Sequence, residues 1–223
     1  MELNGKKGQV IVLRSGKEQE VKLGDGDWCY APCTITLVRP RDRSTSYVVD
    51  TGCFGESYEV QKLVEDEGLG LGNIREVIVT HNHPDHAGNV DLFYKKANIV
   101  MPDSSFYLER PNYFRLGFSN EHEIGQIYPA GSLAMKDNGL SLSIINTPGH
   151  AGQDLSVLVD TRDGRVAVVG DLFWSQEDWE HDSEFLELCV NPEMQRRSRD
   201  YVREKIRPDA VVPGHGCSFE PKY

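Results

Sequence analysis

Short apolar runs, separated by polar segments that contain glycine or proline, dominate the hydrophobic pattern of this chain. Most of these runs span four to seven residues and are rich in β-branched side chains, which is typical of buried strands rather than of long helices. The pattern predicts strands over 10–13, 21–23, 34–38, 46–49, 76–80, 99–101, 140–146, 155–160, 165–169 and 210–212.

Three of the connections between these strands are short enough to predict hairpins. We expect 10–13 to pair with 21–23 around Gly16, and 34–38 to pair with 47–49 around the charged loop at 39–43. The third hairpin joins 155–160 to 165–169 through Asp163-Gly164. The sequence therefore predicts strands that are mostly neighbours of those adjacent to them in the chain.

Helical patterns alternate with the strands. A helix is predicted over 57–67, with Tyr58, Leu63 and Val64 on its buried side and Gly68 just after its end. A short helix is predicted at 87–93, and a basic one runs through 196–207. The stretch 103–125 shows no regular pattern, so we expect it to form a rim or a dimer segment.

The length and composition are those of one globular domain spanning residues 1–223. The chain is 39% hydrophobic, which suffices for a sizeable core, and it contains no apolar run of membrane-spanning length. The first seven residues lack the apolar core of a signal peptide, and the five cysteines are an odd number. We therefore expect a soluble protein of the cytoplasm or nucleus with reduced thiols and no membrane partner.

The candidate chemistry centres on the run from Thr80 to His86, which places three imidazoles and a carboxylate within six residues. Buried without partners, these groups would each lose hydrogen bonds to water, and a metal ion satisfies all of them together. Imidazole nitrogens suit zinc and iron, and carboxylate oxygens extend the choice to manganese. Pro84 indicates a loop that opens into a helix, at the carboxyl end of the strand predicted before it.

Three later stretches place a His or an Asp at the point where a predicted strand ends. His150 follows Thr-Pro-Gly, Asp171 follows a glycine, and His215 follows Pro-Gly, so tight turns are available at each. Upstream, Asp50 follows the strand at 46–49, where it can orient a ligand from behind together with Thr80.

The remaining polar and aromatic candidates carry weaker signals. His122 and His181 lie among acidic residues and are expected to be solvated. Cys53 and Cys217 lie near the motifs but are expected to pack as small apolar groups. Five aromatic residues are candidate walls of a substrate cleft or covers of the core edge, and the sequence leaves both readings open: Phe54, Phe114, Phe118, Trp174 and Trp179.

Taken in order, these motifs resemble the metallo-β-lactamase fold superfamily from Asp50 to His215. The resemblance implies an α/β (α+β) fold, the four-layer αββα sandwich, with the ligands at one edge where loops from both halves meet. It also implies two divalent metal ions, expected to be zinc, with iron or manganese as alternatives. In that arrangement His81, His83 and His150 hold one ion, Asp85, His86 and His215 hold the second, and Asp171 bridges them.

Two such ions bind a bridging water and lower its pKa, and the resulting hydroxide attacks a carbonyl carbon or a phosphorus. The second ion stabilises the developing oxyanion or the leaving group. Asp85 is expected to orient the hydroxide and to shuttle a proton while it ligates. The sequence therefore predicts a metal-dependent hydrolase, although it assigns no residue to substrate binding.

Segments around 150–157, 170–173 and 195–216 are similar to a group within the superfamily, metallo-β-lactamase domain-containing protein 1 of animals. That similarity implies a homodimeric endoribonuclease, a phosphodiesterase that cleaves histone pre-mRNA. The net charge of −11 weighs against a broad nucleic-acid footprint, and the basic residues at 196–207 are either a phosphate-steering face or a solvated face.

Two alternatives to a nuclease stay open. One is a small-molecule thioesterase or lactonase of the glyoxalase-II-like type, acting on an ester or thioester. The other is a mononuclear iron oxygenase or a binding module, which the full set of seven ligands disfavours.

Overall fold

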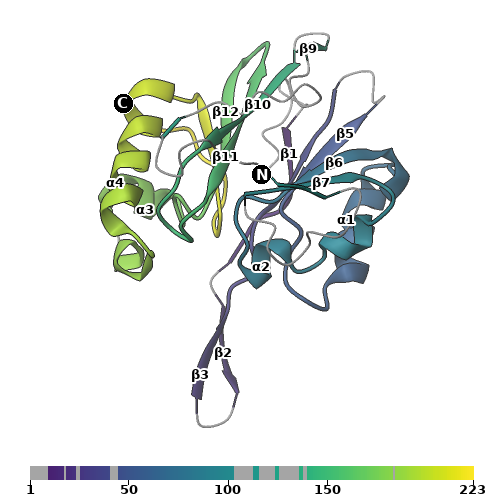
Figure 1. Cartoon of the computed structure of the whole chain (residues 1–223), viewed down its shortest axis with the longest axis horizontal. Helices are drawn as coiled ribbons and strands as arrows, with labels where there is room; N and C mark the ends of the chain where they lie inside the picture. The colour runs from purple at the N-terminus through teal and green to yellow at the C-terminus, as the bar shows by residue number, and fades with distance from the viewer. Residues whose placement is uncertain are drawn as a thin grey trace.

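Two β-sheets packed face to face between outer helices make up the protein (Figure 1). The computed structural model describes residues 10–17, 19–23, 26–40, 45–102, 113–115, 124–125, 136–137, 140–182 and 184–223. The predicted αββα sandwich is therefore confirmed. Within these ranges, no helix combines the length and the apolar character that a membrane crossing requires.

The first sheet contains six strands in the order β1-β4-β5-β6-β7-β8. The pairs β1–β4 and β4–β5 are antiparallel, whereas β5 to β8 run parallel to one another. The strands are β1 (Val10–Arg14), β4 (Ile35–Val38), β5 (Ser46–Val49), β6 (Ile74–Ile78), β7 (Asn98–Met101) and β8 (Tyr113–Arg115). The helical segments of this half are α1 (Ser57–Asp66), η1 (Leu71–Asn73), α2 (Pro84–Ala87) and η2 (Val90–Phe93).

The second sheet contains five strands in the order β13-β12-β11-β10-β9, and only β12 and β13 are parallel. The strands are β9 (Lys136–Asp137), β10 (Leu140–Asn146), β11 (Leu155–Thr161), β12 (Gly164–Gly170) and β13 (Ala210–Pro213). Its outer face carries α3 (Gln176–His181), η3 (Glu184–Leu188), α4 (Pro192–Tyr201) and the π-helical turn η4 (Val202–Ile206).

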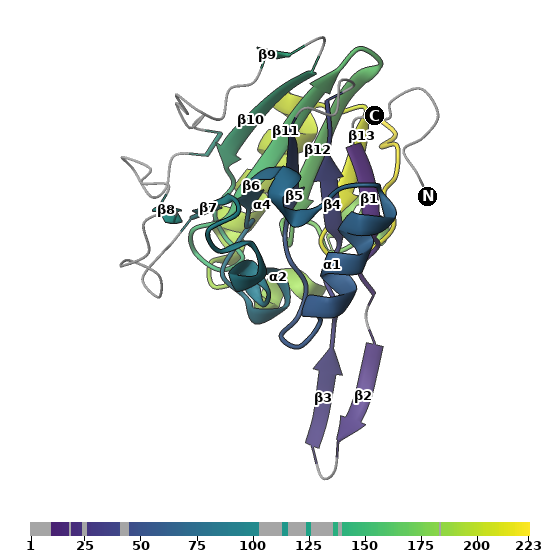
Figure 2. The same ribbon diagram turned by 90° about the vertical axis from the view of Figure 1, so that its right-hand side faces the viewer.

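The strands β2 (Gln19–Leu23) and β3 (Gly26–Tyr30) form a separate two-stranded hairpin that projects from the body in both views (Figures 1 and 2). The predicted pairing of 10–13 with 21–23 is therefore wrong. Strand β1 pairs with β4 instead, because that register buries Val10 and Ile11 in the body of the protein. The two other predicted hairpins, β4–β5 and β11–β12, are present.

Three apolar clusters fill the three interfaces between the four layers. One lies between the sheets, one lies between the first sheet and α1, and one lies between the second sheet and the segments α3 and η4. In α1 the buried positions are Val60 and Val64. The expected burial of Val64 is confirmed, and Leu63 is partly buried. The expected burial of Tyr58 is wrong, because this residue is 81% exposed.

The stretch at 103–125 is described only at β8 and at residues 124–125, where Gly125 donates to the Asn146 carbonyl. The prediction that this stretch forms a rim or a dimer segment otherwise lies outside the described residues.

The carboxyl ends of β5, β6, β10, β12 and β13 meet along one edge of the sandwich. Backbone hydrogen bonds join the loops there, since Leu155 N–H donates to Thr80 and Thr34 N–H donates to Gly214. The same loops carry the predicted metal ligands.

Candidate metal centre

The structure brings all seven predicted ligands together as two adjoining groups. One group contains His81, His83, His150 and Asp171, and the other contains Asp85, His86 and His215. Within each group the potential ligand atoms lie within 4.8 Å of one another. Four of the seven residues follow β6, and the other three come from the second sheet, so the centre joins the two halves of the fold.

Asp171 lies between the two groups. Its Oδ2 is 3.3 Å from His150 Nε2 and 3.7 Å from His81 Nε2. Its Oδ1 is 3.1 Å from His86 Nε2 and 3.4 Å from His215 Nε2. One carboxylate therefore presents a different oxygen to each group, which is the geometry that a bridging ligand needs.

Local sequence explains how the ligand loops reach this position. His83 has extended backbone and precedes Pro84, which is the first residue of α2, and its carbonyl accepts from the amides of His86 and Ala87. The turn after β12 depends on Gly170, which has a φ of +52° and leaves no room for a Cβ beside Thr80. Before His215, a Cβ on Gly214 would overlap the carboxylate of Asp171.

Asp50 and Thr80, which the sequence predicts to lie behind the ligands, contact His86 and His81, respectively. Asp50 Oδ2 is 2.8 Å from His86 Nδ1, and the carboxylate also accepts from the Thr80 amide at 2.8 Å and the Thr80 hydroxyl at 2.9 Å. This contact leaves Nε2 of His86 to face the centre. Asp50 has a φ of 62°, a left-handed conformation that Asp and Asn adopt more readily than most residues.

The donor set fits divalent metal ions. His83 Nδ1 and His150 Nε2 are 3.0 Å apart, and His81 Nε2 is buried without a hydrogen-bond partner among the described residues. Burial lowers the pKa of His81 and of His83, and it lowers that of His150 to about 4. These imidazoles are therefore neutral at physiological pH, the form that binds metal.

The carboxylates are charged, as ligands must be. Burial alone would raise the pKa of Asp171, yet the neighbouring imidazoles of His86, His215 and His81 hold it well below its ordinary value. Burial likewise opposes ionisation of Asp85, and the contact with His215 nonetheless lowers its pKa. The side chain of Asp85 is 25% exposed, whereas that of Asp171 is 3% exposed, so Asp85 has more contact with solvent.

Sequence reasoning missed two residues that hold the His150 loop. Asp154 is buried, and its carboxylate accepts from the amides of Gly149 and Ala151 at 2.9 Å, while burial raises its pKa to about 7. An acid four residues after a candidate ligand was the available signal. Cys189 places Sγ 3.8 Å from His150 Nδ1, and no pattern in the sequence marked it.

The prediction that the basic residues at 196–207 form one exposed face is wrong in part. Arg199 is 1% exposed, donates to the Leu172 carbonyl, and lies 2.6 Å from the buried carboxylate of Asp178. Arg203 contacts Asp182 and lies over the ring of Phe173. Arg199 therefore belongs neither to a solvated face nor to a phosphate-steering face. Both arginines tie α4 and η4 to the segment after Asp171, and Arg203 keeps 23% of its side chain exposed.

Gln195 is a further support from α4, because its buried side-chain amide donates to the carbonyls of Asp171 and Leu172. Arg196 and Arg197 are exposed, as both the solvated-face and the phosphate-steering predictions require.

The other candidates have varied positions. Trp174 stacks against His215, whereas Trp179 is 7% exposed and packs in the cluster under α3. Phe54 is 71% exposed, and the side chains of Phe114 and Phe118 lie outside the described residues. Cys217 is exposed and Cys53 is partly buried, so the expectation that both pack as small apolar groups is wrong for Cys217.

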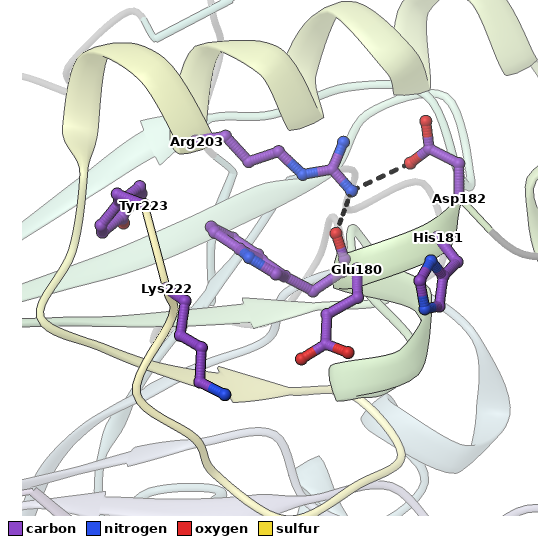
Figure 3. Close-up of a pocket in the computed structure, with 7 residues that line it drawn as sticks. Glu180, His181, Asp182, Arg203, Lys222 and Tyr223 are labelled. Atoms are coloured by element: carbon purple, nitrogen blue, oxygen red, sulfur yellow. Dashed lines mark hydrogen bonds and ion pairs between the residues drawn. The ribbon is translucent and has the colours of Figure 1, made fainter.

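A pocket of about 790 Å³ lies beside α3 (Figure 3). Its charged lining contains two acids, Glu180 and Asp182, and two bases, Arg203 and Lys222, and none of its lining residues is a predicted ligand. His181 at its edge is exposed, as expected, and His122 lies outside the described residues.

Comparisons with known proteins agree with this geometry. The profile of the metallo-beta-lactamase superfamily matches residues 31–215. Metallo-beta-lactamase domain-containing protein 1 of Xenopus laevis is 31% identical over 216 residues, which cover 96% of this chain and 82% of that protein. The human protein of the same name is 32% identical over 94% of this chain and 80% of its own length.

Solved structures show the same fold at lower identity. A putative metallo-beta-lactamase from Thermotoga maritima superposes with a TM-score of 0.64 at 19% identity, over 96% of this chain and 99% of that chain. AiiA from B. thuringiensis, with N-decanoyl-L-homoserine bound at its active site, gives 0.64 at 17% identity, over 93% and 92%.

Proposed function

The chain belongs to the metallo-beta-lactamase superfamily, and on that premise we propose that it is a hydrolase with a dinuclear metal centre. The observation that carries this proposal is the placement of Asp171, whose two carboxylate oxygens face two separate groups of histidines. A mononuclear oxygenase or a binding module would not need the second group.

When bound, a pair of divalent ions would supply an acidified water as nucleophile and would stabilise negative charge on the substrate. The protein residues hold this arrangement in place. Asp50 fixes the ring of His86, Asp154 fixes the loop of His150, and Asp171 spans both groups. Asp85 is ionised and partly exposed, with Oδ2 3.3 Å from His215 Nε2, so it is the group suited to accept a proton from the attacking water.

For the substrate, we propose single-stranded RNA, cleaved at a phosphodiester bond as in histone pre-mRNA processing. The support is the similarity to metallo-beta-lactamase domain-containing protein 1, which extends over nearly the whole chain. On the same basis we propose a homodimer that acts in the nucleus or the cytoplasm, with zinc as its metal. Iron and manganese suit the same donor set, so the metal is to be identified by elemental analysis.

The test is cleavage of an end-labelled single-stranded RNA by zinc-loaded protein. His83→Ala should abolish cleavage, because it removes one of the ligands grouped with His150. The matched control is His181→Ala, which removes an exposed histidine outside both groups and should leave cleavage unchanged. Intact RNA with wild-type protein that carries two metal ions would refute the RNA proposal and leave the metal centre standing.

A second candidate, a lactonase or thioesterase, is favoured by apolar side chains close to the centre. Leu188 and Val190 are 74% and 73% exposed on either side of Cys189, which contacts His150. Exposed apolar groups at such a position suit an acyl chain better than a phosphate backbone. A panel of acyl lactones and glutathione thioesters tests this candidate, and rates equal to those of metal-stripped protein would eliminate it.

A further inference from the structure

Two aromatic rings are stacked behind one of the candidate ligands, His215. Trp174 lies against His215 with ring centroids 3.9 Å apart and planes inclined by 20°. The indole is also stacked against Phe185, with ring centroids 4.5 Å apart and planes inclined by 4°. The His215 amide also donates to the Trp174 carbonyl at 2.9 Å, so backbone and ring both tie the ligand to Trp174.

His215 differs from other ligands in how its ring is held. In His86, His81 and His150, the nitrogen that faces away from the centre contacts Asp50, Thr80 and Cys189, respectively. The corresponding Nδ1 of His215 is buried and has no hydrogen-bond partner among the described residues. Its Nε2 lies 3.3 Å from Asp85 and 3.4 Å from Asp171 and therefore faces the centre.

We propose that Trp174 is a positioning residue that holds His215 by ring stacking and thereby favours metal binding at the group formed with Asp85 and His86. Coordination to a divalent ion withdraws electrons from an imidazole, and a positively polarised ring is stabilised over the negative face of an indole. The stack replaces the hydrogen bond that usually orients a ligating histidine. This inference rests on the proposed dinuclear centre.

The indole nitrogen of Trp174 strengthens the argument that stacking is its role. Nε1 is buried and has no hydrogen-bond partner among the described residues, so the side chain supplies its ring face and no hydrogen bond. A phenylalanine at this position would keep most of the stack and would remove the buried donor. Leucine would fill part of the volume but would supply no π face.

The first measurement is intrinsic fluorescence during titration of metal-free protein with Co²⁺, which quenches nearby indoles. The emission of the wild-type protein should fall as the second equivalent binds, and this fall should be absent from Trp174→Phe. Trp179→Phe is the matched control, because Trp179 lies in the cluster under α3 and should leave the quenching in place. Quenching that persists in Trp174→Phe would overturn the assigned contact.

The second measurement is the dissociation constant for each Zn²⁺, obtained by competition with a chelator. Trp174→Leu should weaken binding of the second ion about tenfold, as expected from loss of a cation–π contact, and leave the first unchanged. Trp174→Phe should restore the second affinity to within about threefold of wild type. Trp174→Met, an unbranched side chain without a ring, takes the place of Trp174→Leu if the latter fails to fold.

The outcomes separate this inference from the proposed function. Two ions bound with wild-type affinities in the leucine or methionine variant would refute the role of Trp174 and leave the dinuclear centre intact. A wild-type protein that binds fewer than two ions would refute the dinuclear centre, and the inference with it.

Discussion

Replacing Asp50 with Asn tests the support behind the metal centre with the smallest change of shape. Asn is nearly isosteric and tolerates the left-handed conformation at this position, where φ is 62°. The carboxylate accepts from the Thr80 amide and lies 2.8 Å from His86 Nδ1. If the Asn oxygen keeps the contact with Thr80, its NH₂ group faces His86, and His86 must then present a lone pair at Nδ1.

That change moves the imidazole proton to Nε2, which is the nitrogen that faces Asp171 and the centre. Loss of such a supporting contact typically weakens metal binding by about 10-fold to 100-fold, or about 1.4–2.7 kcal/mol. In the metal-free protein, burial opposes protonation of His86, yet Asp171 and Asp50 raise its pKa well above the ordinary value. Loss of this charge-assisted contact should also lower the free energy of unfolding by about 2 kcal/mol.

The assay is chelator competition with zinc, together with urea denaturation of the metal-free protein. Asp163→Asn is the matched control, since it removes one carboxylate from the exposed turn between β11 and β12. We expect the control to match wild type in both measurements. An Asp50→Asn protein that binds its second ion as tightly as the control would refute the argument that this carboxylate sets the tautomer of His86.

Three further predictions concern residues around the centre and in the core. Asp154→Asn should weaken the first metal site about tenfold, because its NH₂ group replaces one acceptor oxygen and would face a loop N–H that now donates to it, and zinc competition checks this. Burial raises the pKa of Glu76 from 4.5 to about 7, so the folded chain binds this proton more tightly than the unfolded chain. Between pH 5 and 8, stability should therefore fall by about 2 kcal/mol more in wild type than in Glu76→Gln, as measured by urea denaturation. Arg199→Ala should cost about 3–5 kcal/mol of unfolding free energy, because it removes the positive charge that faces the buried Asp178 carboxylate. Arg196→Ala, at an exposed position, should cost less than about 0.5 kcal/mol in the same assay.

The strands that end at the centre were predictable because each combines an apolar β-branched run with a polar turn. The predicted bounds of 140–146 agree with β10, and those of 165–169 and 210–212 lie within a residue of β12 and β13. The ligands follow these runs directly, so locating the strand ends also located the site. Their assignment to two groups came from the family resemblance, and the distances from Asp171 to both groups agree with it.

The remaining features depend on tertiary contacts that single-sequence patterns do not contain. Strand β1 pairs with β4 rather than with the nearest apolar run, because the intervening hairpin closes on itself. Arg199 reads as a surface residue by composition, and only the fold shows Asp178 opposite it in the core. Cys189 comes near His150 through η3, a turn with no marked sequence pattern.

The division of the ligands between the two sheets has a consequence for how quickly the protein folds and unfolds. Four ligands lie in the six-residue stretch from His81 to His86 that follows β6, while the other three follow β10, β12 and β13. An ion that requires both sets gains its full ligand set only once the sheets have packed, so we expect most of its contacts to be absent from the folding transition state. Interactions absent from the transition state slow unfolding and leave the folding rate nearly unchanged. The bound ions would therefore slow unfolding and prolong the lifetime of the native state.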